Sequence, residues 1–157
     1  MATTAKKSLI MYSISFIASQ DFEQLYAIEQ VAHSVPWSLG TLKNNQGERY
    51  LNLKLQRQNQ IIGFAICQTV LDEATLFNLA IHPSFQGQGL GSRLLRELIN
   101  QLQTKGIATL WLEVRESNLT AQNLYLNKGF NLVDIRKNYY PTKDGKRENA
   151  IVMALHL

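Results

Sequence analysis

The sequence predicts a single mixed α/β domain. Short β-rich runs such as IIGFAIC alternate along the chain with segments whose apolar residues recur at helical spacing. Strand-like runs are frequent in the first half, and helix-like segments separate the later ones. The 157 residues are 45% apolar, enough for one core, and contain neither a repeat nor a linker. We therefore expect one domain over residues 1–157, with a frayed tail within residues 1–10.

The first predicted elements are a strand and two helices. Residues 12–17 can form a short strand. Residues 21–32 have helical periodicity, and Ser19 is placed to cap this first helix. A second, shorter helix is expected after the segment Pro36-Trp37-Ser38. The apolar side chains that define the first helix are Phe22, Leu25, Ile28 and Ala32.

A hairpin and a further strand come next. YLNLKL, at residues 50–55, alternates apolar and polar side chains. A polar turn at residues 57–60 separates it from the β-rich run 61–71, so the two runs together predict a hairpin. Residues 74–81 supply another strand.

A central helix follows a glycine-rich stretch. Its pattern ends near Lys105-Gly106, and a cationic last turn followed by glycine is typical of a helix C-terminus. Its apolar stripe consists of Leu94, Leu95, Leu98, Ile99 and Leu102.

The last part of the chain alternates strands with one more helix. Residues 108–114 predict a nearly buried strand that carries a single acid, Glu113, on the face opposite its leucines. Ser117 or Asn118 can cap a helix that runs through Asn127 and stops at Gly129. The chain then closes with strands at 130–136 and 150–155 around a polar loop.

The glycine-rich stretch predicts an anion-binding loop. Gly87, Gly89 and Gly91 lie between the end of a strand and the start of a helix, where unpaired N–H groups and the helix dipole attract phosphate. Glycines let the backbone turn and approach a bulky anion, and Ser92 can add a hydroxyl. The alternative is an ordinary flexible loop.

Two nucleotide-binding motifs match this stretch poorly. A Walker-type loop needs Lys-Ser or Lys-Thr after its last glycine, and none is present. A dinucleotide site needs a third glycine where Ser92 stands, although Glu113 could take the place of its ribose-binding acid. The loop before the first glycine is also long for that fold, and too little chain remains for a second nucleotide-binding half.

Two motifs resemble the GNAT N-acetyltransferases. QGQGLG, at residues 86–91, resembles the Q/R-x-x-G-x-G/A signature whose loop holds the pyrophosphate of acetyl-coenzyme A, and SNLTAQNLYLNKGF, at 117–130, resembles the family's later N-x-x-A-x-x-L-Y-x-x-x-G-F pattern. The resemblance implies the GNAT fold, with a mixed and largely antiparallel central sheet of about six or seven strands flanked by about four helices.

Further segments are similar to the bacterial RimI branch of that family. EQVAHSVPWS, NQGERYLNLKL, TLWLEVRESN and RKNYYP carry the similarity, which runs from Ile14 to Leu155. It implies direct transfer of the acetyl group from acetyl-coenzyme A to the N-terminal alanine of small-subunit ribosomal protein number eighteen. The first ten residues and the basic charge depart from the pattern.

Two residues are candidates for the proton transfers. A neutral amine must attack the thioester, so Glu113 is the candidate base, acting through water, and the resemblance implies the same role. The alternative is a structural pair with Arg115. Tyr125 can protonate the departing thiolate. Its spacing alone favours core packing, whereas the resemblance implies the general acid.

The cofactor contacts follow the same logic. Backbone groups of one strand end should bind the pantetheine arm, and the glycine-rich loop should bind the pyrophosphate. Asn118 is either a helix cap or a pantetheine contact, and the resemblance favours the contact. The expected cofactor contacts are Leu79, Ala80, Ile81, Gln86, Gly87, Gln88, Gly89, Leu90, Gly91, Ser92 and Asn118.

Acceptor residues are predicted in two polar segments. Tyr50, Tyr139 and Tyr140 can pack against the first side chains of a peptide, and Glu48 can meet a basic residue further along it. The resemblance places both segments on the substrate side, although each can equally be an ordinary turn.

Composition limits the other possibilities. The lone Cys67 excludes an internal disulfide and lies in an apolar run typical of a buried residue, and His33, His82 and His156 lack metal-ligand spacing, so no metal is expected. No apolar run is long enough to span a membrane, which favours the cytoplasm. The net charge of +4 suits an anionic ligand or a ribosomal neighbourhood.

Several functional alternatives stay open. We expect a monomer or weak dimer without direct nucleic-acid readout. Within the family, the alternative is transfer to lysine side chains or small amines. Outside it, the alternatives are a non-catalytic acyl-coenzyme A module and the dinucleotide-binding protein considered above.

Overall fold

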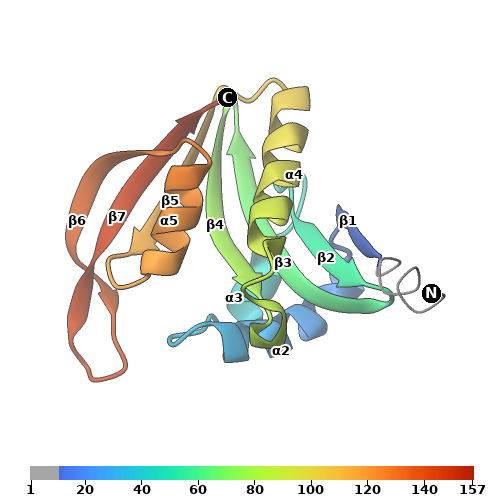
Figure 1. Ribbon diagram of the computed structural model, residues 1–157, viewed down its shortest axis with the longest axis horizontal. Helices are drawn as coiled ribbons and strands as arrows, with labels where there is room; N and C mark the ends of the chain where they lie inside the picture. The colour runs from blue at the N-terminus through green and yellow to red at the C-terminus, as the bar shows by residue number, and fades with distance from the viewer. Residues whose placement is uncertain (1–10) are drawn as a thin grey trace, which may run out of the picture.

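The computed structural model describes residues 11–157, which form a seven-stranded sheet flanked by four α-helices and two 3-10 turns (Figure 1). The strand order is β1-β2-β3-β4-β5-β7-β6, and every neighbouring pair except β4 and β5 is antiparallel. The predicted fold class is therefore confirmed, whereas the predicted tail lies outside the described residues. Within residues 11–157, no helix has the length and apolar character needed to cross a membrane.

The elements follow the predicted order. Along the chain they are β1 (Tyr12–Phe16), η1 (Ser19–Asp21), α2 (Phe22–Ala32), α3 (Leu39–Asn44), β2 (Leu53–Arg57), β3 (Gln60–Val70), β4 (Glu73–Ile81), η2 (Pro83–Phe85), α4 (Leu90–Thr104), β5 (Thr109–Arg115), α5 (Leu119–Asn127), β6 (Asn131–Pro141) and β7 (Arg147–His156).

The start of α2 differs from the prediction. Ser19 does not cap the helix but opens the 3-10 turn that precedes it. Asp21 organises this corner instead, because its carboxylate accepts the Ala18 N–H at 2.8 Å and pairs with Lys54 Nζ at 2.7 Å. A carboxylate that satisfies both a backbone donor and a cation is a stronger organiser than an exposed hydroxyl. Ser38 does cap α3, since its Oγ accepts the Thr41 N–H.

The hairpin β2–β3 forms three residues later than predicted. Tyr50 makes only an isolated bridge with Gln68, and β2 begins at Leu53. Asn52 interrupts the regular ladder because its side chain accepts the Cys67 N–H at 3.0 Å and donates to the Asn45 carbonyl at 2.8 Å. The alternating pattern of YLNLKL cannot reveal that the Asn52 side chain replaces a backbone carbonyl as the acceptor of the Cys67 N–H.

The helices cover opposite faces of the sheet. Leucines of α4 and Tyr125 of α5 belong to one core cluster, and these two helices run in front of the sheet in Figure 1. The apolar side chains of α2 and Leu42 of α3 pack on the other face against Phe64, Ile66 and Ala80. Strand β3 is buried on both faces, which explains its continuous apolar run.

A bulge and a separation of strands open the sheet at its centre. β4 and β5 pair in parallel only from Glu73–Thr109 to Leu76–Leu112, and Figure 1 shows them diverging below that point. At the same place β4 carries a bulge, because Ile66 pairs with Asn78 and Cys67 with Leu76, which leaves Phe77 without a partner. A bulge bends its strand and ends regular pairing, so the two strands enclose a cleft.

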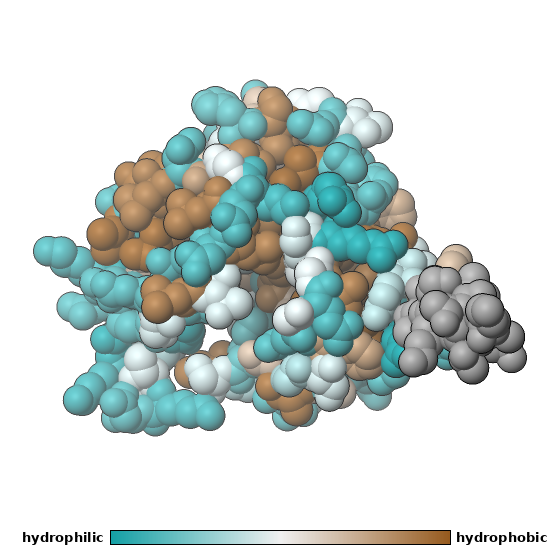
Figure 2. Space-filling model, viewed as in Figure 1, coloured by the Kyte–Doolittle hydropathy of each residue, from teal (hydrophilic) through white to brown (hydrophobic). Residues whose placement is uncertain are grey.

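The closing hairpin is longer than predicted. β6 extends to Pro141 and β7 begins at Arg147, so most of the expected polar loop is strand. Its residues are exposed and polar because this ribbon projects from the sheet edge, and polarity alone therefore misidentified it as a loop. In Figure 2 the hairpin end is hydrophilic, whereas apolar side chains gather over α5 and the neighbouring strands. Those exposed apolar residues include Leu119, Leu126, Leu132, Val133 and Ile135.

Candidate active site

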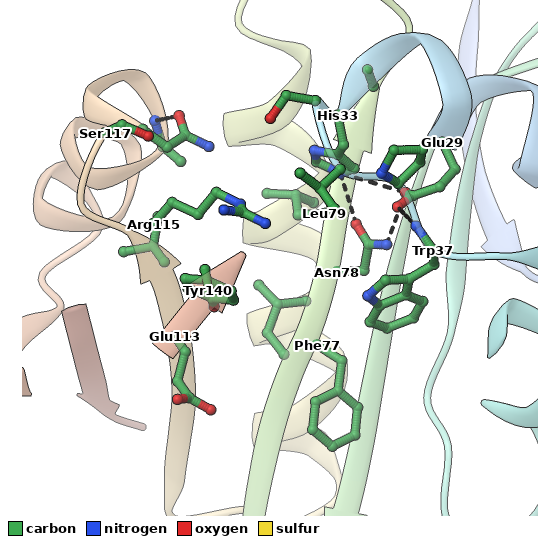
Figure 3. Close-up of a pocket in the computed structure, with 18 of the residues that line it drawn as sticks. Glu29, His33, Trp37, Phe77, Asn78, Leu79, Glu113, Arg115, Ser117 and Tyr140 are labelled. Atoms are coloured by element: carbon green, nitrogen blue, oxygen red, sulfur yellow. Dashed lines mark hydrogen bonds and ion pairs between the residues drawn. The ribbon is translucent and has the colours of Figure 1, made fainter. Parts of the chain in front are cut away.

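A cleft of about 610 Å³ lies where β4 and β5 separate. Its floor is the bulged part of β4, from Leu76 to Leu79. One wall is residues 32–37, between α2 and α3. The opposite wall is formed by β5, α5 and the closing hairpin. Figure 3 shows Glu113, Arg115 and Tyr140 on that side, facing Glu29, His33 and Trp37 across the opening.

Glu113 projects from β5 into this cleft. Its side chain is 28% exposed, and its Oε2 lies 3.2 Å from Arg136 Nε on β6. Oε2 itself is buried and accepts no hydrogen bond within the described residues, while the Tyr139 hydroxyl donates a long bond of 3.5 Å to Oε1. Glu113 does not pair with Arg115, which excludes the structural alternative suggested by the sequence. Because the side chain is 28% exposed at the cleft, water can reach the carboxylate there and pass a proton to it.

Arg115 instead fastens the closing hairpin. Its Nη1 donates to the Pro141 carbonyl at 2.8 Å and to Glu148 Oε2 at 3.1 Å, and its guanidinium stacks 4.5 Å from the centre of the Tyr140 ring. Glu148 Oε1 also accepts the Ser117 N–H at 3.0 Å. These bonds hold Tyr140 at the cleft wall. Burial and the nearby Glu113 charge raise the pKa of Tyr140 to about 12.

Tyr125 lies on α5 with its ring in the core and its hydroxyl at the cleft. The residue is 7% exposed, and its ring packs against Phe130 at a centroid distance of 5.5 Å. It nevertheless lines the cleft, and no hydrogen bond to its hydroxyl is present within residues 11–157. Burial, with a smaller contribution from Tyr140, raises the pKa of the Tyr125 phenol. Core packing and a chemical role are therefore compatible.

The glycine-rich loop leads directly into α4. Gly87 and Gly89 have φ values of +76° and +77°, and a Cβ at either position would meet no atom within 4 Å. Gly89 is the N-cap of α4, so the free N–H groups of the first turn begin there. Gly91 differs from the prediction because it is helical. A Cβ there would contact Leu124 and Ile81 side chains at 3.7 and 3.8 Å, so Gly91 permits close packing and not a turn.

The strand end before this loop exposes backbone groups to the cleft. The His82 N–H donates to the Ile62 carbonyl, which sets the phase of the antiparallel ladder between β3 and β4. In that phase Ala80 bonds toward β3, whereas Leu79 and Ile81 direct their backbone groups to the side that β5 has left. Of the three predicted residues, Leu79 is oriented in this way and lines the cleft, whereas Ala80 and Ile81 do not line it. The Ile81 carbonyl already accepts a bond of 2.9 Å from Gln86 Nε2.

The family model described as Acetyltransferase (GNAT) family matches residues 12–130, most of the described chain. The chain belongs to the GNAT acetyltransferase family. The protein is thus an acetyltransferase.

Curated relatives and solved structures agree with this assignment. A Haemophilus influenzae protein is 70% identical over 147 residues, which cover 94% of this chain and 100% of the relative. An Escherichia coli K12 protein is 56% identical over 145 residues, covering 92% and 97%. Both relatives are named ribosomal protein bS18-alanine N-acetyltransferase. The crystal structure of the E. coli ribosomal-protein-S18-alanine N-acetyltransferase has a TM-score of 0.90 at 55% identity and covers 93% of this chain and 94% of that one.

The GNAT domain brings some predicted residues together and leaves others apart. Asn118 lines the cleft and is also a helix cap, since its Oδ1 accepts the Ala121 N–H at 3.1 Å. Glu48 and Tyr50 do not line the cleft, and the Tyr50 hydroxyl donates to Asn45 instead. Tyr139 does not line the cleft but contacts Glu113 and the Tyr140 ring, which do.

One polar cluster of the cleft was not predicted from the sequence. Glu29 and Asn78 are 1% and 8% exposed, and both contact His33 at the α2 side. Glu29 falls within a helical pattern, and its burial could have been suspected because position 29 lies beside Ile28 and one turn after Leu25. Asn78 carried no signal at all.

The remaining candidates behave as buried or capping groups. Cys67 is fully buried, and burial raises the pKa of its thiol to about 12, so it is not a nucleophile at neutral pH. His82 caps the turn η2 through a bond from the Ser84 N–H. Among residues 11–157, no three His, Cys, Asp or Glu side chains converge in a way that could hold a metal ion.

Proposed function

We propose that this acetyltransferase transfers the acetyl group of acetyl-coenzyme A directly to the N-terminal alanine of ribosomal protein bS18. The observation that carries the proposal is the near-complete alignment with proteins of that name, at 70% and 56% identity. The open cleft between β4 and β5 is compatible with it, since an extended peptide can enter between residues 32–37 and the closing hairpin.

The residues of the cleft fit acetyl-coenzyme A. The first turn of α4, with Gly87, Gly89 and Ser92, would bind the pyrophosphate through N–H groups and a hydroxyl. Leu79 and Ile81 would bind the pantetheine arm by their backbone, as a strand edge binds an extended ligand. The Asn118 Nδ2 group can add a bond, because only its Oδ1 is used by the cap.

Glu113 is the proposed base. The acceptor amine arrives largely protonated, because an α-amino group has a pKa of about 8. Glu113 would take its proton through a bound water, after which the nitrogen forms the new bond to the acetyl carbon. The partial exposure of Glu113 at the cleft supports this role, and the ion pair with Arg136 holds the carboxylate in place.

Tyr125 is the proposed acid. As the carbon–sulfur bond breaks, the sulfur takes the phenolic proton, and the second proton, which the nitrogen loses as the amide forms, restores the phenol. The raised pKa of Tyr125 keeps the phenol protonated until that moment, and the same desolvation raises the proton affinity of the departing thiolate.

Mass spectrometry tests the activity. The protein and acetyl-coenzyme A are incubated with a peptide carrying the first residues of bS18, and with a lysine-containing peptide whose N-terminus is blocked. We expect acetylation of the alanine amine only. Transfer to lysine alone would support the alternative within the family, and binding of acetyl-coenzyme A without any transfer would support a non-catalytic module.

Substitution of the base gives the matched test of mechanism. Glu113→Gln should lower kcat by about 10²- to 10⁴-fold, the usual contribution of a general base, with little change in acetyl-coenzyme A KM. Glu73→Gln is the control, because Glu73 lies at the far end of β4 and its side chain bonds, within residues 11–157, only to Trp111. Equal rates for Glu113→Gln and the wild type would remove Glu113 from the reaction.

A further inference from the structure

We infer that Glu29, Asn78 and His33 form a positioning cluster that sets the affinity for the acceptor peptide. The cluster would act by holding residues 32–37 as the cleft wall opposite Glu113. This inference rests on the proposed function, because it assigns the acceptor to that side of the cleft. It concerns binding of the acceptor and not the transfer of protons.

Glu29 is the centre of the cluster. It lies on α2 and is 1% exposed, yet both of its carboxylate oxygens have donors. Oε2 accepts the Trp37 N–H at 2.9 Å, and Oε1 accepts Asn78 Nδ2 at 2.9 Å. One buried carboxylate therefore joins the wall segment, at Trp37, to the floor of the cleft, at Asn78.

The bulge in β4 is what brings Asn78 to this cluster. Ala74 and Leu76 pack in the core cluster beneath α4, whereas Ala80 packs in the cluster beneath α2. In a regular strand all four even-numbered residues from 74 to 80 would share one face. The unpaired Phe77 reverses the alternation, so Asn78 points to α2 and meets Glu29.

His33 completes the cluster at the rim of the cleft. Asn78 Nδ2 is directed at Glu29, so Asn78 Oδ1 must accept, and His33 Nε2 lies 3.0 Å from it. His33 therefore carries its proton on Nε2, which also lies 3.5 Å from Glu29 Oε1. Figure 3 shows the three side chains joined in this way beside Leu79 at the opening.

The cost of the cluster argues for a role beyond packing. Burying a carboxylate is unfavourable, and apolar side chains in the same space would often be at least as stable. Directional bonds to a buried charge fix the distance between two segments more closely than apolar contacts can. Here the two segments are the floor of the cleft, at Asn78, and its wall, at Trp37, and His33 faces the opening.

Kinetics of variants test this inference. Glu29→Gln keeps the size of the side chain but replaces one acceptor by a donor, so either Trp37 or Asn78 loses its partner. We expect the KM for the bS18 peptide to rise about tenfold or more, as a lost bond to a charged group implies, while the acetyl-coenzyme A KM stays within about twofold.

Asp21→Asn is the matched control. Asp21 is also a buried acid at α2, with 6% exposure, but it pairs with Lys54 and does not line the cleft. It should lower Tm without moving the peptide KM. If Asp21→Asn raises the peptide KM as much as Glu29→Gln, the cluster is merely structural and the inference is wrong.

His33 provides a second test that does not depend on a buried residue. Its side chain is 29% exposed, so His33→Ala should fold normally and raise the peptide KM by about threefold. His33→Gln places an N–H donor near the position of Nε2 and should restore the wild-type value. Failure of His33→Ala to change the peptide KM, or failure of glutamine to restore it, would overturn the inference.

The outcomes also separate this inference from the proposed function. If the wild type acetylates only lysine, the bS18 assignment fails, and the same KM comparison is made with the lysine peptide. An acceptor KM raised by Glu29→Gln in that case still supports the cluster, and an unchanged one refutes it.

Discussion

Single residues in this protein acquire their roles from partners that lie far away in the chain. Glu113 and Arg115 share a face of β5, yet one pairs with Arg136 on β6 and the other with Glu148 on β7. The sequence identified both Glu113 and Tyr125 as candidates, because an acid in an apolar strand and a tyrosine in a family motif are visible locally. The ion-pair partners of Glu113 and Arg115 could not be predicted from the sequence, since cross-strand register decides which side chains meet.

At Tyr125 the hydroxyl can be tested apart from the ring. Tyr125→Phe keeps the packing against Phe130 and removes only the proton donor. We expect kcat to fall by about 10²-fold with Tm unchanged, because the hydroxyl has no partner within residues 11–157. Tyr140→Phe should instead raise the peptide KM more than the acetyl-coenzyme A KM. A normal kcat for Tyr125→Phe would leave Tyr125 with packing alone.

The pH dependence of the wild type follows from the same group. The pKa of Tyr125 is raised, so the phenol stays protonated throughout the range in which enzymes are usually assayed. The rate should rise with pH as the acceptor amine loses its proton, and should not fall before about pH 10. If the rate of acetyl transfer, measured as a function of pH, declines near pH 8 while circular dichroism shows that the protein is still folded, this assignment is contradicted.

Elements were predicted well wherever their pattern is local. The stripe of α4 located the end of that helix, and the alternation in β5 located both ends of that strand, to within one residue, because packing against one face imposes one period. Patterns were insufficient where a side chain replaces a backbone partner, as Asn52 does before β2. They were also insufficient in the closing hairpin, whose exposed residues follow no period of burial.

The loop before α4 yields a prediction about conformation. Gly89→Ala forces a left-handed residue to carry a Cβ, which costs about 1–2 kcal/mol and should move the N–H groups of the first turn. We expect the acetyl-coenzyme A KM to rise several-fold. Gly145→Ala is the control, because Gly145 has a φ of +80° and equally open surroundings in the closing hairpin. Calorimetry gives both stabilities, and an equal KM for the two variants would exclude a special role for the loop.

The start of α2 yields a prediction about pH and stability. Partial burial opposes ionisation of Asp21, but Lys54 and the Ala18 N–H hold the pKa of its carboxyl below its ordinary value. Asp21 therefore stabilises the fold above the unfolded pKa of about 4, and this contribution is lost as the pH falls through the lower folded pKa. Asp21→Asn should lower the free energy of unfolding at neutral pH by about 1–3 kcal/mol. Urea titrations at several pH values should show that this free energy falls less steeply in acid for the variant than for the wild type. An equally steep fall for both proteins would contradict the assignment.

At the scale of the molecule, the cleft exists because the sheet divides at its centre. Strands β1 to β4 and strands β5 to β7 are joined by only four residue pairs between β4 and β5. The helices α4 and α5 lie on the same face of the sheet and contribute to one core cluster. The Arg115–Glu148 pair then holds the closing hairpin over the opening.

Release of that hairpin gives a prediction for the whole molecule. Despite partial desolvation, bonds from Ser117 and Arg115 hold the pKa of Glu148 below its ordinary value. The Arg115–Glu148 ion pair should therefore persist to mildly acidic pH. Glu148→Gln should speed hydrogen exchange in residues 138–147 and raise the peptide KM, while exchange in α4 stays slow. Uniform acceleration of exchange would show that Glu148 supports global stability and not the hairpin in particular.

The sequence by itself determined the fold class and the order of the elements, and it identified the glycine-rich loop as a candidate anion site and Glu113 and Tyr125 as candidate catalytic residues. Each of these depends on local periodicity or on a motif within about fifteen residues. Only the tertiary structure decided the partners of Glu113, the backbone groups that face the cleft, and the Glu29–Asn78–His33 cluster. The physical reason is strand pairing, which no local pattern encodes. The register of β5, β7 and β6 sets the partners of Glu113, and the unpaired Phe77 reverses which side chains of β4 face each layer.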